Sequence, residues 1–193
     1  FILGGSLVPF PQLDLSDCVL VVVDLQARLM QAMPAEDAES VVENSIRMIK
    51  GAQVLGVPIL ATEQYPRGLG PTAQDVLDVF PDELSVIEKV DFSCQKVPEY
   101  RDALEALGRK TVVLCGVEAH VCIYQTALDS LAAGYHTVVV ADAICSRLPV
   151  NRDLAIESLR QAGALLSPAE SVLFEWLGRA GGDAFKEISR MLR

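Results

Sequence analysis

The sequence has no uninterrupted apolar run of about 20 residues, which is the length that a membrane-spanning helix needs. Its longest apolar stretch, Cys18 to Val23, stops at Asp24 and has the length of a β-strand. Basic residues are also scarce: 16 Lys and Arg stand against 26 Asp and Glu, so the formal net charge is -10. A field of this sign repels phosphate backbones and anionic headgroups. We therefore expect neither a membrane nor a nucleic acid among the partners.

Several patterns that indicate a bound metal or nucleotide are missing. The two histidines, His120 and His136, are isolated, whereas a metal site needs clustered His, Asp or Glu. There is no Walker-type phosphate loop and no G-x-S-x-G nucleophile elbow. Residues 68–73 match the dinucleotide fingerprint G-x-G-x-x-A, but they lie well past the end of the preceding predicted strand. We expect no metal and no cofactor.

Cysteine is present, but not in a pattern typical of disulfides or zinc. The five cysteines are odd in number, form no C-x-x-C pair and follow no basic secretory leader, which favours a reducing compartment. We expect five free thiols and a cytoplasmic location, with an organelle as the open alternative. Residues 1–15 are expected to be an N-terminal tail or a cloning remnant, and residues 16–193 a single domain.

Short β-branched runs alternate with longer segments of helical period, which indicates crossover connections and a mostly parallel sheet. Residues 20–23 and 138–140 are apolar throughout, as in strands covered on both faces. The predicted strands are 18–23, 57–61, 86–88, 111–115, 137–141 and 164–167. The sequence thus predicts a three-layer, doubly wound, Rossmann-like α/β fold with a six-stranded sheet and helices on both faces. In the order 3-2-1-4-5-6, the first and fourth strands flank the switch point where ligands bind.

Two other segments are less regular or more apolar than this pattern requires. Residues 62–81 form a long irregular connection, which is either a plain surface excursion or a functional loop. The tail from Pro168 to Arg193 indicates two helices, with apolar residues clustered around Trp176. We expect a homo-oligomer in which this apolar surplus is covered by a partner. The alternative is that both tail helices simply pack on the domain.

Three candidate residues stand where predicted strands or turns end, at the edge where open α/β sheets bind ligands. Asp24 is either an acid or base or the N-cap of the next helix. Lys89 follows the third strand, although most lysines are solvated surface residues. Cys122 opens a helix, where the dipole lowers a thiol pKa and backbone N–H groups can bind an oxyanion. Its alternative is a buried structural thiol.

The remaining thiols and His120 are weaker candidates. Cys18 and Cys115 lie in predicted strands and are expected to be structural. The roles of Cys94 and Cys145 stay open. We interpret His120 as a turn residue, because residues at i and i+2 point to different sides and do not form a Cys-His pair.

The segments around the three candidates resemble the isochorismatase-like cysteine hydrolases. These segments are Val23-Asp24-Leu25-Gln26, Glu88-Lys89-Val90-Asp91-Phe92-Ser93 and Gly116-Val117-Glu118-Ala119-His120-Val121-Cys122. The likeness extends over residues 62–72 and 141–147, and it spans the chain from about Ser16 to the end. Each motif is short, but three in this order are specific. The sequence is most similar to the isochorismatase domain-containing group related to the bacterial YcaC hydrolase.

The resemblance implies an Asp-Lys-Cys triad formed by Asp24, Lys89 and Cys122. Such a triad cleaves an amide or related C–N bond of a small molecule through a thioester. One difficulty is geometric, because the third strand lies about 10 Å from the first at normal strand spacing. Lys89 is therefore expected to reach the site from a curling loop.

The resemblance also implies a non-proline cis peptide bond between Val117 and Glu118. The backbone N–H groups of Glu118 and Cys122 would then form an oxyanion hole. The substrate pocket is expected to include three residues of the matching segments, namely Gln26, Tyr65 and Phe92.

The sequence departs from two better-known branches of this family, and each departure argues against the activity of that branch. Nicotinamidases of this family carry an Asp-x-His metal cluster after the second strand, whereas residues 62–72 contain no histidine. True isochorismatases lack the cysteine, so Cys122 favours acyl transfer. Relatives commonly assemble as dimers, tetramers or octamers, which adds to the expectation of a homo-oligomer. The alternative function is a catalytically silent oligomeric binding protein with the same fold.

Overall fold

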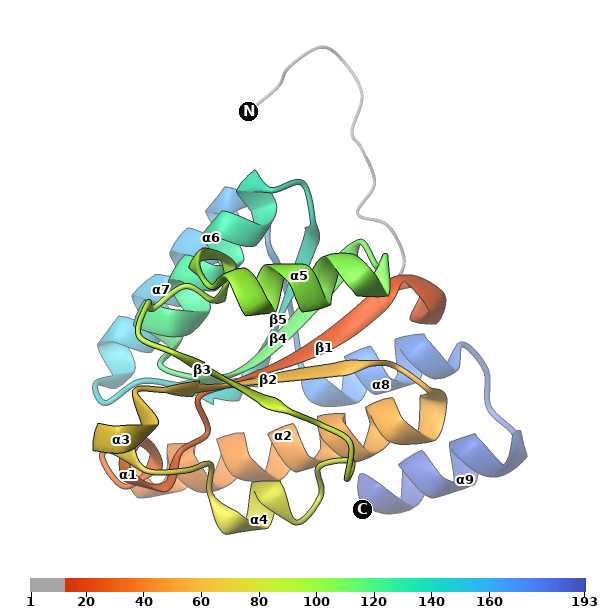
Figure 1. Cartoon of the computed structure of the whole chain (residues 1–193). Coiled ribbons are helices and arrows are strands. Elements are labelled where there is room, and N and C mark those ends of the chain that lie inside the picture. The colour runs from red at the N-terminus through yellow and green to blue at the C-terminus, as the bar shows by residue number, and fades with distance from the viewer. Residues whose placement is uncertain (1–12) are drawn as a thin grey trace.

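The structure is a computed structural model that describes residues 13–193. Six parallel strands form one sheet in the order β3-β2-β1-β4-β5-β6, which confirms the doubly wound α/β class and is the order considered above for a switch point between the first and fourth strands (Figure 1). The strands are β1 (Cys18–Val23), β2 (Ile59–Gln64), β3 (Val86–Lys89), β4 (Thr111–Val117), β5 (His136–Cys145) and β6 (Leu165–Ser167). The predicted tail residues 1–12 lie outside the described part of the chain.

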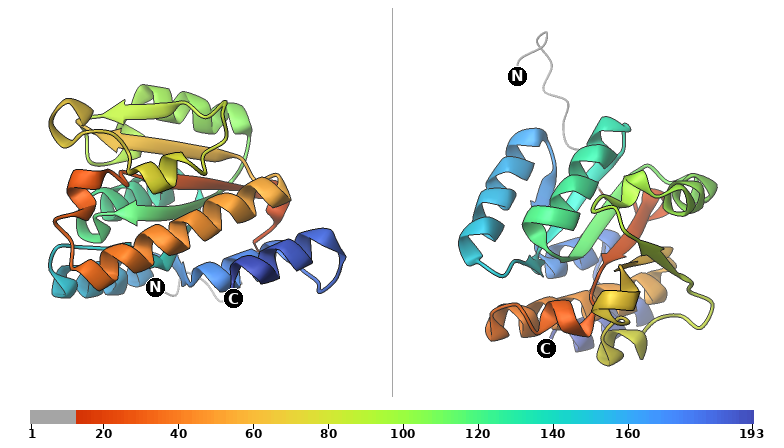
Figure 2. Two further views of the ribbon diagram at one scale, coloured as in Figure 1. Left: turned by 90° about the horizontal axis from the view of Figure 1, so that it is seen from below. Right: turned by 60° about the vertical axis from the view of Figure 1, so that its left-hand side comes forward.

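Helices cover both faces of this sheet. They are α1 (Ala27–Met30), α2 (Ala35–Leu55), α3 (Pro66–Leu69), α4 (Gln74–Leu77), α5 (Pro98–Leu107), α6 (Tyr124–Ala132), α7 (Pro149–Ala162), α8 (Ala169–Leu177) and α9 (Gly182–Met191). Helices α2, α8 and α9 pack on one face, and α5, α6 and α7 pack on the other. The right-hand view of Figure 2 shows α6 and α7 separated from α2 by the strands.

Strand β1 shows why the sheet is buried on both sides. Cys18, Leu20 and Val22 face the core under α2, while Val19, Val21 and Val23 face the core under α5 and α6. Successive side chains of a strand point to opposite faces, so an apolar run fills both cores at once.

Several predicted boundaries were wrong, and the causes are local. The second strand begins at Ile59 because Gly56 ends α2 in a left-handed conformation and Val57 and Pro58 complete the turn. The fourth and fifth strands run further than predicted, to Val117 and Cys145, past an irregularity in their pairing. The connection 62–81 contains two short helices, α3 and α4.

Gly116 permits the close approach of β1 and β4 at the edge where the candidate residues lie. Its φ is +118°, and a Cβ atom there would overlap the carbonyl oxygen of Val23. Only glycine adopts this conformation with no side chain to displace. The ends of the two central strands, and the residues that follow them, are therefore held together.

The tail helices pack on the domain, so the predicted exposed apolar surplus was wrong. Val172, Leu173, Trp176 and Ile188 are buried in the core under α2. Among the large apolar residues of the tail, only Phe174 is substantially exposed, at 38%. The terminal helices thus complete the layer on this face of the sheet.

Candidate active site

Asp24 follows β1 directly and is completely buried. It does not cap a helix, because α1 begins at Ala27 with Gln26 as its N-cap. Its φ of +53° turns the chain out of the strand. Oδ1 accepts a hydrogen bond of 2.8 Å from Thr62 Oγ1, and Oδ2 accepts one of 2.6 Å from Lys89 Nζ. The carboxylate is thus held at both oxygens.

Lys89 is the last residue of β3, so the expectation that it reaches in from a curling loop was wrong. In the register of β3 with β2, Lys89 pairs with Gln64. Its side chain passes over the end of β2, and Nζ donates to Gln64 Oε1 at 2.6 Å on the way to Asp24. Nζ also lies 3.5 Å from Cys122 Sγ. A lysine stem is long enough to span one strand, which sequence spacing alone did not reveal.

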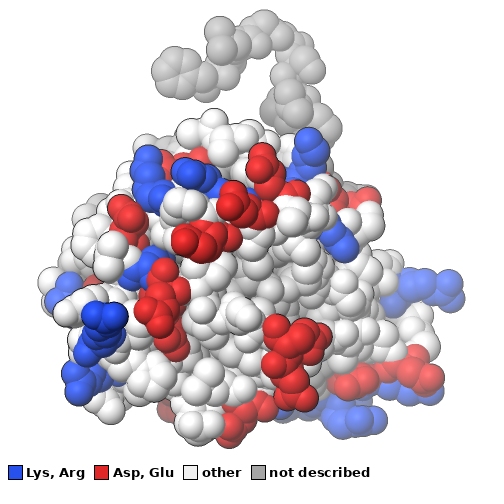
Figure 3. All heavy atoms as spheres, in the orientation of Figure 1, with Lys and Arg blue, Asp and Glu red and all other residues white. Residues whose placement is uncertain are grey.

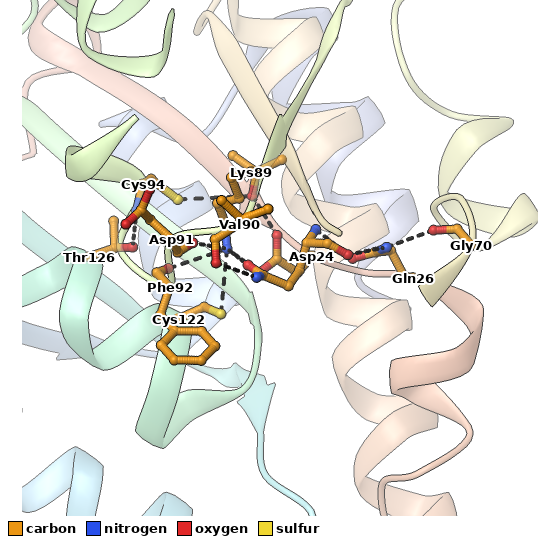
Figure 4. A network of polar contacts seen from close by, with 12 residues as sticks. Asp24, Gln26, Gly70, Lys89, Val90, Asp91, Phe92, Cys94, Cys122 and Thr126 are labelled. Atoms are coloured by element: carbon orange, nitrogen blue, oxygen red, sulfur yellow. Dashed lines mark hydrogen bonds and ion pairs between the residues drawn. The ribbon is translucent and has the colours of Figure 1, made fainter. Parts of the chain in front are cut away.

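The ammonium group of Lys89 lies at the centre of the contacts drawn in Figure 4. Besides Asp24, Gln64 and Cys122, it reaches the carbonyl oxygens of Asp91 and Phe92, each at 3.3 Å. Burial alone would lower the pKa of Lys89, but it is opposed above all by the charge of Asp24, and the pKa is raised. Lys89 therefore remains a cation inside the protein.

Cys122 lies in a π-helical turn, η3 (Ala119–Ile123), which leads into α6. Its side chain is buried, with 5% of the residue exposed. Burial and the charge of Asp24 raise the pKa of the Cys122 thiol to about 12, although Lys89 acts in the opposite direction. The overall shift is thus opposite in direction to the one expected from a helix dipole, and it favours the neutral thiol at Cys122.

All five cysteines are free, as predicted, and all five are buried. Cys18 and Cys115 lie in strands, and Cys145 ends β5. Burial raises the pKa of Cys115 and of Cys145 to about 12 and that of Cys18 to about 11. Of the five cysteines, only Cys122 has its sulfur within hydrogen-bond distance of a lysine.

The turn before Cys122 contains the bond singled out by the resemblance. The peptide bond between Val117 and Glu118 is cis. The Glu118 carboxylate accepts hydrogen bonds from the backbone N–H and from Nε of Arg147, the shortest at 3.0 Å. This ion pair ties the turn to the segment after β5.

His120 is held away from Cys122 by other partners. Its Nδ1 lies 2.9 Å from Ser146 Oγ, and its Nε2 lies 3.5 Å from Asn151 Nδ2. These contacts suit its interpretation as a turn residue.

The three predicted pocket residues differ in their surroundings. Tyr65 and Phe92 are exposed by 54% and 51%, and the Phe92 carbonyl oxygen touches Lys89. Gln26, in contrast, is completely buried. Its Nε2 donates to the carbonyl oxygens of Gln64 and Gly70, and its Oε1 accepts from the Gln64 backbone N–H. The Gln26 side chain thus joins the end of β2 to the loop at Gly70, so we do not retain it among the substrate contacts.

Replacing Gln26 by leucine should reduce the free energy of unfolding by about 3 kcal/mol, because three partly buried backbone groups lose their hydrogen bonds to its side chain. Urea unfolding would measure the change. Gln161→Leu is the matched control, because Gln161 is exposed and donates only to Glu157. Equal stability of the two variants would contradict the role of Gln26.

Two groups that hold Asp24 and Lys89 were not singled out from the sequence. Thr62 and Gln64 are two residues apart in β2 and bind Asp24 and Lys89 respectively. Their signal was the alternation of a strand, since residues at i and i+2 share a face. Cys94, in η2 (Cys94–Lys96), lies behind Thr62, with 3.9 Å between Cys94 Sγ and Thr62 Oγ1.

Residues 13–193 contain no group of three or more His, Cys, Asp or Glu side chains arranged to hold a metal ion. Within the same range, no helix is both long and apolar enough to cross a membrane.

Comparison with known sequences and structures places the chain in a family. The family model described as the isochorismatase domain matches residues 18–171. Isochorismatase domain-containing protein 2 of Xenopus laevis is 38% identical over 175 residues, which make up 90% of this chain and 82% of that protein.

Solved structures share the fold along nearly the whole chain. A structure described as MAR1 ribonuclease from Caenorhabditis elegans has a TM-score of 0.88 at 31% identity, covering 94% of this chain and 92% of that one. YcaC from Pseudomonas aeruginosa, with hexane-2,5-diol and covalent acrylamide, has a TM-score of 0.81 at 26% identity, with 94% and 92% covered. The YcaC gene product of Escherichia coli shares the fold, with a TM-score of 0.83 at 24% identity and 95% and 88% covered. On the family model and the Xenopus laevis relative, the chain belongs to the isochorismatase family, a family of isochorismatase-like hydrolases.

Proposed function

We propose that this protein is a cysteine hydrolase that cleaves an amide or related C–N bond of a small molecule through a thioester on Cys122. The observation that carries the proposal is the position of one buried ammonium group, which bridges a carboxylate and a thiol. Lys89 Nζ lies 2.6 Å from Asp24 Oδ2 and 3.5 Å from Cys122 Sγ. A base, a cation and a nucleophile in contact are the parts that covalent acyl transfer requires.

In the first half-reaction Asp24 takes the proton of the Cys122 thiol, and the sulfur attacks the substrate carbonyl carbon. Lys89 stabilises the thiolate as it forms, which lowers the cost of charging a buried sulfur. The backbone N–H groups of Glu118 and Cys122 are proposed to bind the oxyanion. When the C–N bond breaks, protonated Asp24 gives its proton to the leaving nitrogen.

In the second half-reaction water attacks the thioester carbonyl carbon, and Asp24 accepts a proton from that water. The C–S bond breaks, the acid product leaves, and Asp24 returns the proton to Cys122. Tyr65 and Phe92, both exposed, are proposed to contact the substrate.

The decisive experiment combines labelling of Cys122 with a screen of small amides and related C–N compounds. Acrylamide is a suitable label, because the solved YcaC from Pseudomonas aeruginosa carries covalent acrylamide. Selective labelling of Cys122 and hydrolysis that the label blocks would support the enzyme. Labelling of Cys122 no faster than labelling of the other four thiols, with no hydrolysis, would favour the silent binding protein.

Activity should survive treatment with a chelator, because the segment from Thr62 to Thr72 carries none of the histidines of the metal-binding branch. Elemental analysis and an assay before and after dialysis against EDTA would measure this. About one zinc or iron per chain, together with activity lost to EDTA, would contradict the prediction.

The proposed substrate is a small molecule and not a nucleic acid. The net charge of -10 opposes binding to a phosphate backbone. On the face drawn in Figure 3, the described residues place acidic and basic side chains among one another, with no continuous basic patch. A cytoplasmic location stays a prediction from the cysteine pattern.

We also propose that the chain forms a homo-oligomer, now through a different surface from the tail. Leu148, Val150 and Leu154, at the start of α7, are exposed by 58%, 58% and 57%. Exposed apolar side chains in one place are typical of interfaces. The Escherichia coli YcaC gene product is described as an octameric hydrolase.

Light scattering at micromolar concentration should therefore give an even multiple of 20.9 kDa. Leu154→Glu should reduce that mass, because a charge would lie in the apolar contact. A wild-type mass near a single chain would contradict the oligomer, and an unchanged mass for Leu154→Glu would contradict this surface.

A further inference from the structure

Asp24 has a second set of contacts on the side away from Lys89. Thr62 Oγ1 donates to Asp24 Oδ1 at 2.8 Å, and both residues are buried, with Thr62 exposed by only 2%. Behind Thr62 lies the Cys94 thiol, whose sulfur is 3.9 Å from the same hydroxyl oxygen. None of these groups meets solvent, so the hydroxyl has no water to exchange partners with.

The direction of the hydrogen bonds follows from the chemistry of the groups. An ionised carboxylate only accepts hydrogen bonds, so the single proton of the Thr62 hydroxyl points at Asp24. The lone pairs of Thr62 are then free to accept from Cys94. Burial raises the pKa of the Cys94 thiol to about 11, so Cys94 keeps its S–H proton at neutral pH and is a donor.

The far end of this chain of contacts is anchored on the helix that follows Cys122. The Cys94 backbone N–H donates to Thr126 Oγ1 at 3.0 Å, and Thr126 is completely buried in α6. The polar contacts therefore run from β1 through β2 and η2 to α6. Figure 4 shows Cys94 and Thr126 on the opposite side of Lys89 from Gln26 and Gly70.

We propose that Thr62 is a positioning residue for Asp24, supported from behind by Cys94. This inference rests on the proposed function of Asp24 as the base for Cys122. With Oδ2 held by Lys89 and Oδ1 held by Thr62, the carboxylate cannot rotate, and a remaining lone pair stays directed at the thiol proton.

The test is the rate at which iodoacetamide alkylates Cys122 as a function of pH, followed by peptide mass spectrometry, with no substrate present. Thr62→Val keeps the shape of the side chain and removes the hydroxyl. Without the hydroxyl, Asp24 loses its partner at Oδ1 and removal of the Cys122 proton becomes less favourable, so the acid limb of the alkylation profile should move to higher pH by about one unit. At a pH within that limb, alkylation should be about tenfold slower than in the wild type.

Three further variants separate positioning from general damage to the structure. Thr62→Ser restores the hydroxyl and should return the profile to that of the wild type. Thr137→Val is the matched control, because Thr137, in β5, is about as buried but donates to the Tyr135 carbonyl oxygen. Its profile should not move. Cys94→Ala should shift the limb in the same direction as Thr62→Val but by less, since the contact it removes is long.

A Thr62→Val profile that coincides with the wild type would overturn the inference, as would a Thr62→Ser profile as shifted as that of Thr62→Val. An unshifted Cys94→Ala profile would remove Cys94 from the proposal. If Thr62→Val does not fold, as judged by circular dichroism, Thr62→Ala replaces it against the same outcomes. A wild-type Cys122 no more reactive than the other thiols would instead overturn the proposed function, so the two failures are distinct.

Discussion

Cys122→Ala should abolish hydrolysis, reducing the rate by at least about 10⁴-fold, because no other residue is placed to carry the covalent step. Cys122 is the thiol that meets both Lys89 and the charge of Asp24. The variant should also take up no acrylamide label at the site. The assay is turnover of the substrate found in the screen, together with the intact mass of the labelled protein.

Cys115→Ala is the matched control, since Cys115 is equally free but lies inside β4 and contacts the Val21 carbonyl oxygen. This variant should retain activity within about tenfold of the wild type. It should instead be less stable than the wild type, as expected when a small cavity is left in the core. Full activity of Cys122→Ala would exclude the thioester mechanism.

Lys89→Met should destroy activity and also destabilise the fold, by about 3 to 5 kcal/mol, because it leaves the Asp24 charge buried without its partner. Both side chains of this ion pair are completely inaccessible to solvent. Chemical unfolding at pH 7 would measure the stability, and the labelling rate of Cys122 would report on the site.

The choice of pH 7 for the Lys89→Met unfolding measurement follows from the direction in which the pKa of Lys89 is shifted. The pKa of Lys89 is raised above its ordinary value of 10.5 in the folded chain. The stabilisation from its charge is therefore complete below about pH 10.5 and is lost only as the pH rises through the folded-state pKa. Measurement at pH 7 records the whole effect.

Two controls make the Lys89 prediction specific. Combining Asp24→Asn with Lys89→Met should recover at least half of the lost stability and none of the activity, because no buried charge is left unpaired. Lys96→Met removes an exposed ion pair with Asp129 and should cost less than about 1 kcal/mol. A Lys89→Met variant as stable as Lys96→Met would show that the buried pair is not essential to the fold.

The six strands and their parallel arrangement could be predicted because each signal for them is local. An apolar run such as 20–23 is readable as a doubly covered strand, and alternation with helical segments implies parallel crossovers. Boundaries were less accurate where a local feature interrupted the pattern. Strand β5 continues through Asp142 to Cys145, where a polar residue had indicated the end of the strand.

Candidate positions were likewise predictable, but their chemical state was not. Asp24, Lys89 and Cys122 each stood at the end of an element in the sequence, and the structure brings them together. The pKa of Cys122 depends on how deeply it is buried and on which charge is nearest, and these are properties of packing. Gln26 was misassigned to the pocket for the same reason, since burial and partners decide whether an amide is free.

The sequence by itself determined the α/β class and the three candidate residues where strands or turns end, because periodicity and the polar residues that end an element can be recognised from neighbouring residues. Only the tertiary structure decided that Lys89 spans β2 to reach Asp24, that Thr62 and Cys94 stand behind that carboxylate, and that the tail helices are buried. Those facts depend on side chains from distant segments meeting in three dimensions, where reach, burial and competing partners select among contacts that spacing leaves open.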